Sequence, residues 1–318
     1  MTVEQAIKEG AGLLPGDNED ERRRTARLLL GHSMCADHAT LLARWKQPVP
    51  ADQAERYFAL IERRSLGEPL QYIVGHQEFF GYDFLVTPAV LIPRPETEFL
   101  VEQVIKLNSS RAHQAAAAWA PETAASDSPD QPADVDTKEI TGDYSPTIVD
   151  IGTGSGCIAV ALAKVIQHAR VIAIDISYEA LEIARENARR NGAANQIEFI
   201  EGDLCRPLAA LDLDGKVDFI VSNPPYVAAR DRAALQPEVR DFEPGTALFG
   251  GAEGLGFHKR LLEEAPLYLK PGGYLICEIG YGQADEAAHL AEAGRWQLIE
   301  QTPDLQGIPR VLTFQRPL

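Results

Sequence analysis

Cysteines are scarce in this 318-residue sequence, and basic residues are outnumbered by acidic ones. Only four cysteines are present, and no two of them form a CxxC pair. This spacing suggests neither a zinc knuckle nor a disulfide framework, so we expect reduced thiols and no metal site. The 30 Lys and Arg residues face 47 Asp and Glu, which gives a net charge of −17. A protein held on nucleic acid through phosphates needs the opposite balance, so we expect no direct nucleic-acid partner.

Long hydrophobic runs are also missing. No stretch approaches the roughly 18 uncharged apolar residues of a membrane-spanning helix. The amino terminus lacks the basic region followed by an apolar region that marks a secretion signal. We therefore expect a soluble cytoplasmic protein with no targeting segment that makes no contact with a membrane. We also expect it to act as a monomer. Its length and its 45% apolar content favour about two domains.

The first part of the chain, residues 1–68, predicts a small helical domain. Apolar residues recur there at helical spacing, and proline and glycine divide the pattern into four or so helices. Four arginines gather on the second of these helices, namely Arg22, Arg23, Arg24 and Arg27. They form either a solvated face balanced by neighbouring acids or a docking surface for an acidic or RNA-containing partner.

The apolar spacing changes from helical to alternating in residues 69–92, for example at Tyr72 and Val74. This change predicts a β-hairpin that connects two domains. Just beyond it, Pro93 and Pro95 hold the chain extended. That segment is either a rigid linker or one wall of a cleft.

A compositional outlier interrupts the larger domain, residues 93–318, between residues 108 and 146. This stretch has seven acids against two bases and few large apolar residues. Too little apolar surface is present to offset the entropy of ordering, so we expect a disordered acidic insertion. The alanine run at 115–118 is the one part that could extend a helix. We further expect that residues 109–143 can be deleted without loss of activity.

The rest of the larger domain alternates strand and helix patterns, which predicts an α/β fold with a mainly parallel sheet. Parallel strands are predicted at 148–151, 171–174, 197–200, 217–222 and 274–279, with a turn at 271–273 before the last. Two further segments, 297–301 and 311–315, predict a terminal antiparallel pair.

The strand at 217–222 stops at the sequence Asn223-Pro224-Pro225-Tyr226. Two consecutive prolines cannot donate ladder hydrogen bonds, so a stiff loop must follow the strand. Open α/β sheets bind ligands at the carboxyl ends of their strands. This loop offers an amide side chain and backbone carbonyls there, which suits binding of an NH2 group. An isolated motif of this kind is more often a plain tight turn.

Three other strand ends carry residues that suit a nucleoside. Gly152, Gly154 and Gly156 follow the first strand, Asp175 ends the second, and Asp203 comes just after the third. Glycines let a ligand approach the backbone, and a carboxylate such as Asp175 can bind both ribose hydroxyls. The sequence has neither GxGxxG nor GxxxxGK[ST], so a dinucleotide or an ATP phosphate is disfavoured. The pattern fits S-adenosylmethionine, in which Asp203 would face the adenine amino group.

These motifs resemble those of the Rossmann-like class I S-adenosylmethionine-dependent methyltransferases. The helical domain, the segment 67–75 and the segment 92–98 resemble the HemK-type release-factor glutamine methyltransferases in particular. The resemblance covers nearly the whole chain except 108–146. It implies methylation of N5 of the glutamine in the Gly-Gly-Gln motif of class 1 peptide chain release factors, with the helical domain as the recognition domain.

The resemblance also implies site residues. The cofactor contacts would be Gly152, Thr153, Gly154, Ser155, Gly156, Asp175, Asp203, Leu204 and Asn223. The substrate contacts would be Asn223, Pro224, Pro225 and Tyr226, of which Asn223, Pro224 and Tyr226 are catalytic. Asn223 and Pro224 would accept the two hydrogens of the substrate NH2, Tyr226 would pack on the amide, and no general base is evident.

Alternative functions remain open from the residues alone. A ribosomal-protein glutamine methyltransferase typically carries Pro-Arg-Ser-Pro where this chain has Pro93-Arg-Pro-Glu96. A DNA adenine methyltransferase usually adds a DNA-recognition domain and a basic cleft, of which the sequence gives no sign. The third alternative is a nucleoside-binding module without catalysis, and the intact Asn223 and Tyr226 speak against it.

Overall fold

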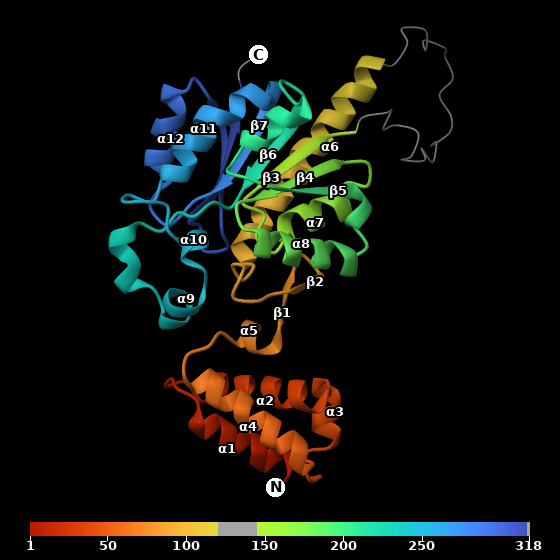
Figure 1. The fold of residues 1–318 in the computed structure, drawn as a ribbon, viewed down its shortest axis with the longest axis vertical. Helices are drawn as coiled ribbons and strands as arrows, with labels where there is room; N and C mark the ends of the chain where they lie inside the picture. The colour runs from red at the N-terminus through yellow and green to blue at the C-terminus, as the bar shows by residue number, and fades with distance from the viewer. Residues whose placement is uncertain (120–144, 317–318) are drawn as a thin grey trace, which may run out of the picture.

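The computed structural model describes residues 1–119 and 145–316, and Figure 1 shows a small helical unit below a larger α/β unit. Four helices make up the helical unit, α1 (Val3–Leu13), α2 (Glu19–Met34), α3 (His38–Ala43) and α4 (Ala51–Ser65). They enclose a hydrophobic core of their own. Thr2 accepts a hydrogen bond from the backbone N–H of Gln5 and caps α1, while Asn18 caps α2. In the described parts of the chain, no helix is long and apolar enough to cross a membrane.

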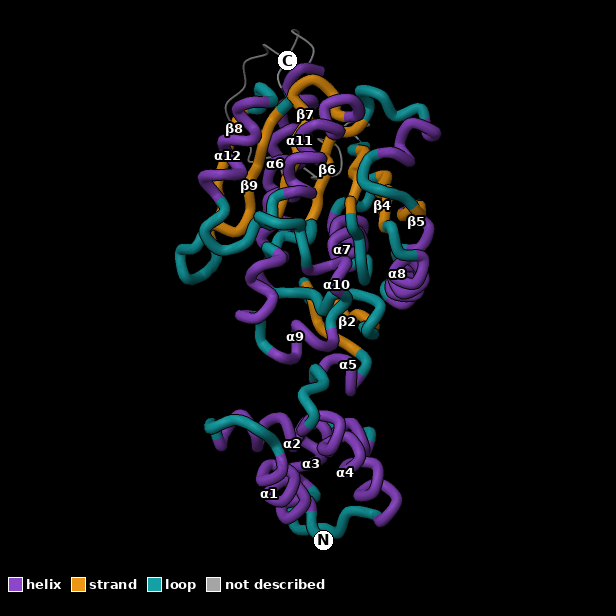
Figure 2. The backbone as a smooth tube through the Cα atoms, turned by 60° about the vertical axis from the view of Figure 1, so that its left-hand side comes forward, coloured by secondary structure: helices purple, strands orange, loops and turns teal. Residues whose placement is uncertain are grey.

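The connector begins with a short helix, where we expected a strand. Its elements are α5 (Leu70–Val74), β1 (His76–Phe79) and β2 (Tyr82–Leu85). Tyr72 and Val74 lie in α5, because Pro69 starts this helix and Gly75, with a φ of +80°, ends it. The predicted hairpin is present only in β1 and β2, which pair antiparallel. In Figure 2 the connector joins the helical unit to the sheet.

A seven-stranded sheet forms the centre of the larger unit. Its strands are β3 (Thr147–Ile151), β4 (Arg170–Asp175), β5 (Ile197–Glu201), β6 (Val217–Ser222), β7 (Leu269–Glu278), β8 (Gln297–Pro303) and β9 (Pro309–Gln315). The order is β5-β4-β3-β6-β7-β9-β8, with the first five strands parallel and β9 antiparallel to both of its neighbours. This arrangement confirms the predicted Rossmann-like fold with a terminal antiparallel pair.

Helices cover both faces of the sheet, as Figure 1 shows. The longer ones are α6 (Glu98–Trp119), α7 (Cys157–Val165), α8 (Tyr178–Arg190), α11 (Gly256–Tyr268) and α12 (Ala284–Ala293). The shorter ones are η1 (Pro95–Thr97), η2 (Ala194–Gln196), η3 (Arg206–Leu211), η4 (Ala229–Ala234), α9 (Pro237–Phe242) and α10 (Gly245–Leu248). One core cluster packs α6, α7 and α8 on one face, and a second packs α11 and α12 on the other. Every residue of β6 is buried between them.

The turn predicted at residues 271–273 is wrong. These residues lie inside β7, which starts five residues earlier than we expected, at Leu269. The pairing with β6 shifts register between Val217 and Phe219, and this irregularity absorbs the extra residues. Gly272, at a φ of +72°, donates its backbone N–H to the oxygen of Arg316.

The predicted boundary of the acidic insertion is also wrong. α6 continues past residue 108 to Trp119, so the alanine run does extend a helix, while residues 120–144 lie outside the described residues. Arg111 on this helix lies 3.2 Å from the buried Asp218 carboxylate and stacks 4.7 Å from the ring centre of Tyr274. A deletion that starts at residue 109 would remove Arg111 and its contacts, so we expect it to lower the free energy of unfolding. That the deletion leaves activity intact stays a prediction.

We expect Arg111→Ala to lower the free energy of unfolding by about 2 kcal/mol, because it removes a cation from a buried carboxylate and from an aromatic ring. Urea unfolding measures this loss. Arg170→Ala is the matched control, since Arg170 pairs with Glu198 in an exposed ion pair of a kind that typically contributes less than about 1 kcal/mol. Equal losses in the two variants would contradict the role assigned to Arg111.

Candidate active site

A cavity of about 380 Å³ opens at the carboxyl ends of β3, β4 and β6. β4 and β6 lie on opposite sides of β3, and such a switch in strand order leaves a crevice in which open α/β sheets bind ligands. The size is within the range of small-molecule sites. Ten residues predicted from the sequence line the cavity, namely Gly152, Thr153, Gly154, Ser155, Asp175, Asp203, Leu204, Asn223, Pro224 and Pro225. Two others, Gly156 and Tyr226, are not part of its lining.

The turn between β3 and α7 presents backbone to the cavity. Gly152 donates its N–H to the backbone oxygen of Ile174, and Gly154 donates to Oδ2 of Asp175, both at 2.8 Å. Apart from its chain neighbours, no residue has an atom within 4 Å of the place that a Cβ would take at Gly152, and at Gly154 the nearest such atom is 4.0 Å away. Open space beside glycine backbone at a cavity wall fits a ligand that lies against the main chain.

Gly156 serves packing rather than the cavity. It precedes α7 with a φ of +79°, and a Cβ at this position would lie 3.0 Å from the Cβ of Ala184 on α8. A side chain here would both strain the backbone and separate the two helices. The third glycine of the motif is therefore explained by the contact between α7 and α8.

Asp175 is held in place at the end of β4. Its Oδ2 accepts the Gly154 N–H, and its Oδ1 accepts the N–H of Ser177 at 2.9 Å. Burial raises the pKa of Asp175, although these backbone hydrogen bonds oppose the shift. A carboxylate has about four lone-pair positions, so Asp175 keeps capacity to accept a hydrogen bond from a ligand beside these backbone bonds.

Asp203 is already engaged by a cation. Both of its oxygens accept hydrogen bonds from Arg260, at 3.0 and 2.8 Å, and these bonds lower the pKa of the carboxyl. Asp203 lines the cavity together with Leu204, which is buried and has a φ of +50°. The carboxylate expected to face an adenine amino group is thus already hydrogen-bonded, through both of its oxygens, to an arginine on α11.

A second acid, Asp150, is buried beneath the glycine turn. Its Oδ2 accepts the hydroxyl hydrogen of Thr153 at 2.6 Å, and burial raises the pKa of Asp150 to about 7. Between about pH 4 and pH 7 the folded protein therefore keeps a proton that the unfolded chain has released. Asp150 accordingly contributes stability at low pH that is lost as the pH rises through this window.

We expect Asp150→Asn to remove this pH dependence. Relative to the unsubstituted protein, the variant should gain about 3 kcal/mol of unfolding free energy between pH 5 and pH 8, because an amide does not ionise. Urea unfolding at the two pH values measures the difference, with Asp214→Asn at an exposed position as the control. If the difference in unfolding free energy between the variant and the unsubstituted protein were the same at pH 5 and pH 8, Asp150 would not be the group responsible.

The loop after β6 places its side chains on opposite sides. Asn223, Pro224 and Pro225 line the cavity, and the Asn223 Nδ2 donates to the hydroxyl oxygen of Thr97 at 3.0 Å. Tyr226 points to the end of β7, where its hydroxyl donates to Oε1 of Glu278 at 3.2 Å. Burial raises the pKa of Tyr226, and the nearby Glu278 carboxyl raises it further.

Sequence reasoning missed Thr97 and Glu278. Both are 2% exposed, and the Thr97 hydroxyl donates to Oε2 of Glu278 at 2.6 Å. A carboxylate at the end of an apolar strand was the one available signal for Glu278, since buried acids need a partner. No local pattern marked Thr97, whose two partners lie 126 and 181 residues away in the sequence.

The segment with two prolines forms one wall of the cavity, as the second of our two alternatives for it predicted. Pro93, Arg94 and Thr97 all line the cavity. The Arg94 guanidinium pairs with Glu243, whose side chain is only 1% exposed. This pair fixes the wall against the long loop that follows β6.

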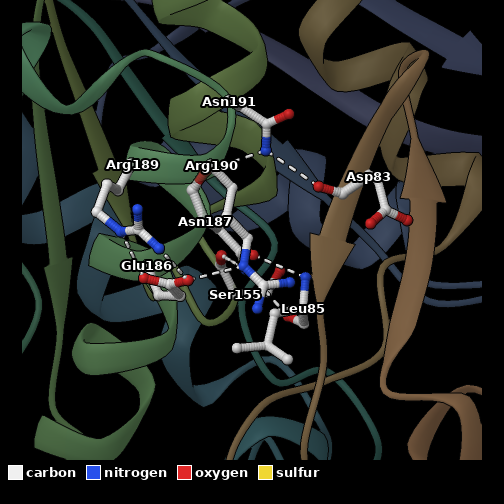
Figure 3. A network of polar contacts seen from close by, with 8 residues as sticks. All are labelled: Asp83, Leu85, Ser155, Glu186, Asn187, Arg189, Arg190 and Asn191. Atoms are coloured by element: carbon white, nitrogen blue, oxygen red, sulfur yellow. Dashed lines mark hydrogen bonds and ion pairs between the residues drawn. The ribbon is translucent and has the colours of Figure 1, made fainter.

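Asn187 on α8 ties the hairpin to the glycine turn, as Figure 3 shows. Its Nδ2 donates to the backbone oxygens of Leu85 and Ser155, at 3.0 and 2.8 Å, and its Oδ1 accepts the N–H of Leu85 at 2.7 Å. The side chain is fully buried, so both ends of the amide are satisfied without water. β2 and the cavity turn are therefore held by one residue.

Comparisons with known proteins agree along the whole chain. Residues 5–75 match the model for the PrmC N-terminal domain, and residues 124–238 match the methyltransferase small domain. A release factor glutamine methyltransferase of Koribacter versatilis is 42% identical over 317 residues, covering 100% of this chain and 99% of the relative. Another, of Geobacter sulfurreducens, is 37% identical and covers 98% of this chain and 95% of the relative.

A likeness to a solved structure supports the fold. The hMettl16 catalytic domain, solved in complex with MAT2A 3′UTR hairpin 6, aligns with a TM-score of 0.50 at 15% identity. The match covers 82% of this chain and 81% of that one. With full-length relatives above 30% identity, the chain belongs to the release factor glutamine methyltransferase family.

Proposed function

We propose that this protein methylates the side-chain nitrogen N5 of the glutamine in the Gly-Gly-Gln motif of class 1 peptide chain release factors. The observation that carries the proposal is the meeting of two groups at one cavity. Asn223 and Pro224 form one part of the wall, and the Gly152–Gly154 turn with Asp175 forms another. The two proposed hydrogen-bond acceptors for an NH2 group and the proposed binding site for a nucleoside thus line the same cavity.

The methyl donor is S-adenosylmethionine, which supplies an electrophilic methyl group on a sulfonium. The open space beside Gly152 and Gly154 and the free lone pairs of Asp175 fit its nucleoside part. The turn has no phosphate-binding signature, and the donor carries no phosphate. Asp203 and Leu204 would complete this side of the cavity.

An amide nitrogen is a poor nucleophile because its lone pair is delocalised into the carbonyl. Oδ1 of Asn223 and the backbone oxygen of Pro224 would each accept one hydrogen of the substrate NH2. Those acceptors hold the nitrogen in one orientation and stabilise the positive charge that develops on it during methylation. Pro225 keeps the loop stiff, and Tyr226 anchors it through Glu278. The methyl group would leave its sulfonium for the amide nitrogen, with S-adenosylhomocysteine as the leaving group. The proton would then pass from the nitrogen to water, so no side chain is assigned as a general base.

Residues 1–68 are proposed as the recognition domain for the release factor, which the protein would meet in the cytoplasm, as a monomer. Arg64 at the end of α4 pairs with Glu238 on α9 at 2.5 Å, so this unit is linked to the loop that follows Asn223. Arg24 and Arg27 line a groove between the helices and the hairpin. A protein surface bound there would contact both the helical unit and the connector.

The test is mass spectrometry of a release factor after incubation with the protein and S-adenosylmethionine. We expect a gain of one methyl group, located by fragmentation on the glutamine of Gly-Gly-Gln. A release factor with that glutamine changed to alanine should gain nothing. Methylation elsewhere, or none in either substrate, would refute the proposal.

A further inference from the structure

A chain of hydrogen bonds runs behind the acceptor loop, in a part of the site that the proposed reaction does not use directly. Asn223 Nδ2 donates to Thr97 Oγ1 at 3.0 Å, and Thr97 donates to Glu278 Oε2 at 2.6 Å. Tyr226 donates to the other oxygen of Glu278 at 3.2 Å. Three separate segments, η1 and the ends of β6 and β7, thus meet on one buried carboxylate.

The numbers of hydrogens in this chain fix its direction as long as Glu278 is ionised. A Glu278 carboxylate can only accept, so the single hydroxyl hydrogen of Thr97 goes to Glu278. Thr97 then has only lone pairs left for Asn223, and the NH2 end of the Asn223 amide must face it. The oxygen of that amide is the end that remains for the cavity.

We propose that Thr97 and Glu278 are positioning residues that set the orientation of the Asn223 amide, so that Oδ1 and not Nδ2 meets the substrate NH2. The consequence for catalysis rests on the proposed function, whereas the orientation itself does not. A reversed Asn223 would place a donor against a donor, which leaves both groups unpaired in a closed site.

Protonation of Glu278 would reverse the chain. A protonated carboxyl can donate to Thr97, whose hydroxyl is then free to donate to Asn223 Oδ1. The Asn223 side-chain amide would then rotate so that Oδ1 faces Thr97 and Nδ2 faces the cavity. Burial raises the pKa of Glu278 to about 7, so we expect this change of hydrogen-bond direction to occur near neutral pH. Hydrogen bonds from Thr97 and Tyr226 oppose that shift.

Other groups around Glu278 act more weakly on its charge. Glu96, next to Thr97 on η1, raises the pKa of Glu278, and Arg310 on β9 lowers it. His258 on α11 faces the backbone of Glu278, with its Nε2 at 2.7 Å from the carbonyl oxygen. Burial lowers the pKa of His258, and its ring contacts the backbone of Glu278 rather than the carboxylate. Glu278 is therefore the group whose proton controls the chain.

The orientation can be measured on the full-length protein without any substrate. The side-chain ¹⁵N–¹H signals of Asn223, assigned by their loss in Asn223→Ala, should shift with a midpoint near pH 7 in the unsubstituted protein and in Thr97→Ser. Thr97→Val keeps the shape but removes the hydroxyl, so the shift should vanish. Glu278→Gln should abolish it as well and serves if Thr97→Val folds poorly. Asn223 signals that titrate unchanged in these two variants would overturn the inference.

Turnover gives the second readout. Thr97→Val should lower kcat by about tenfold, the loss of one hydrogen bond, and flatten its dependence on pH near 7, with KM and the Kd of S-adenosylmethionine unchanged. Thr97→Ser should restore kcat to within about threefold. If the unsubstituted protein is active and Thr97→Val keeps its full kcat, the positioning role is refuted but the proposed function is not. If the Asn223 signals of the unsubstituted protein titrate as expected but the protein methylates no glutamine, the proposed function is refuted and the positioning role is not.

Discussion

Replacing Asn223 by alanine should lower kcat by about a hundredfold to a thousandfold while the Kd of S-adenosylmethionine stays nearly constant. The variant loses one of two acceptors for the substrate NH2, and removing one preorganised partner of a developing charge typically costs about 3–4 kcal/mol of barrier. The remaining acceptor, the carbonyl of Pro224, belongs to the backbone and is unaffected. Steady-state kinetics with a release factor, together with calorimetry of the methyl donor, separate the two effects.

Asn195→Ala is the matched control for this prediction, because Asn195 is an exposed asparagine in η2, outside the cavity lining. It should leave both constants unchanged. Near-normal turnover in Asn223→Ala would remove Asn223 from the catalytic residues. A large rise in the Kd of the methyl donor would instead make Asn223 chiefly a cofactor contact.

Replacing Asp175 by alanine should have the opposite signature. We expect the Kd of S-adenosylmethionine to rise about a hundredfold, because hydrogen bonds from ligand hydroxyls to a carboxylate are charge-assisted and typically contribute about 1.5–3 kcal/mol each. Gly154 and Ser177 also lose the acceptors of their N–H groups, so the turn beside the cavity loosens. At saturating methyl donor, kcat should recover to within about tenfold. Calorimetry and saturation kinetics test the two parts.

Asp214→Ala, at an exposed aspartate, is the control for Asp175→Ala and should bind the methyl donor normally. The pair of predictions is informative as a set, since Asn223 and Asp175 line one cavity but are expected to control different constants. If both variants lost affinity and turnover in the same proportion, a collapse of the cavity would explain them better than separate roles.

The parts of the site that could be predicted from the sequence are those with local causes. Glycines after a strand and consecutive prolines constrain their own backbone, and each motif ends a strand of a parallel sheet. The sheet then brings its strand ends together, so Gly152, Asp175 and Asn223 meet at one cavity. Tyr226 shows the limit, because the side to which its ring turns depends on Glu278, which belongs to another strand.

The features that were predicted wrongly have two different causes. The composition around residue 108 indicated disorder, yet α6 continues to Trp119, and Arg111 on its continuation contacts Asp218 and Tyr274. Alternation at Tyr72 indicated a strand, yet a proline before it and a glycine after it favour one helical turn. In both cases a correct local tendency was outweighed, by tertiary packing in the first and by the chain flanking the segment in the second.

The buried amide of Asn187 has a consequence for where this protein can be cut. A shortened chain that begins at residue 93 lacks β1 and β2. It therefore loses both hydrogen bonds between Asn187 and Leu85, and its sheet core loses Phe79 and Phe84. The hairpin is thus part of the catalytic fold, although it comes before that fold in the sequence. Exchange of recognition modules between relatives should use the Gly67–Gly75 junction, where the chain changes direction at glycines with positive φ.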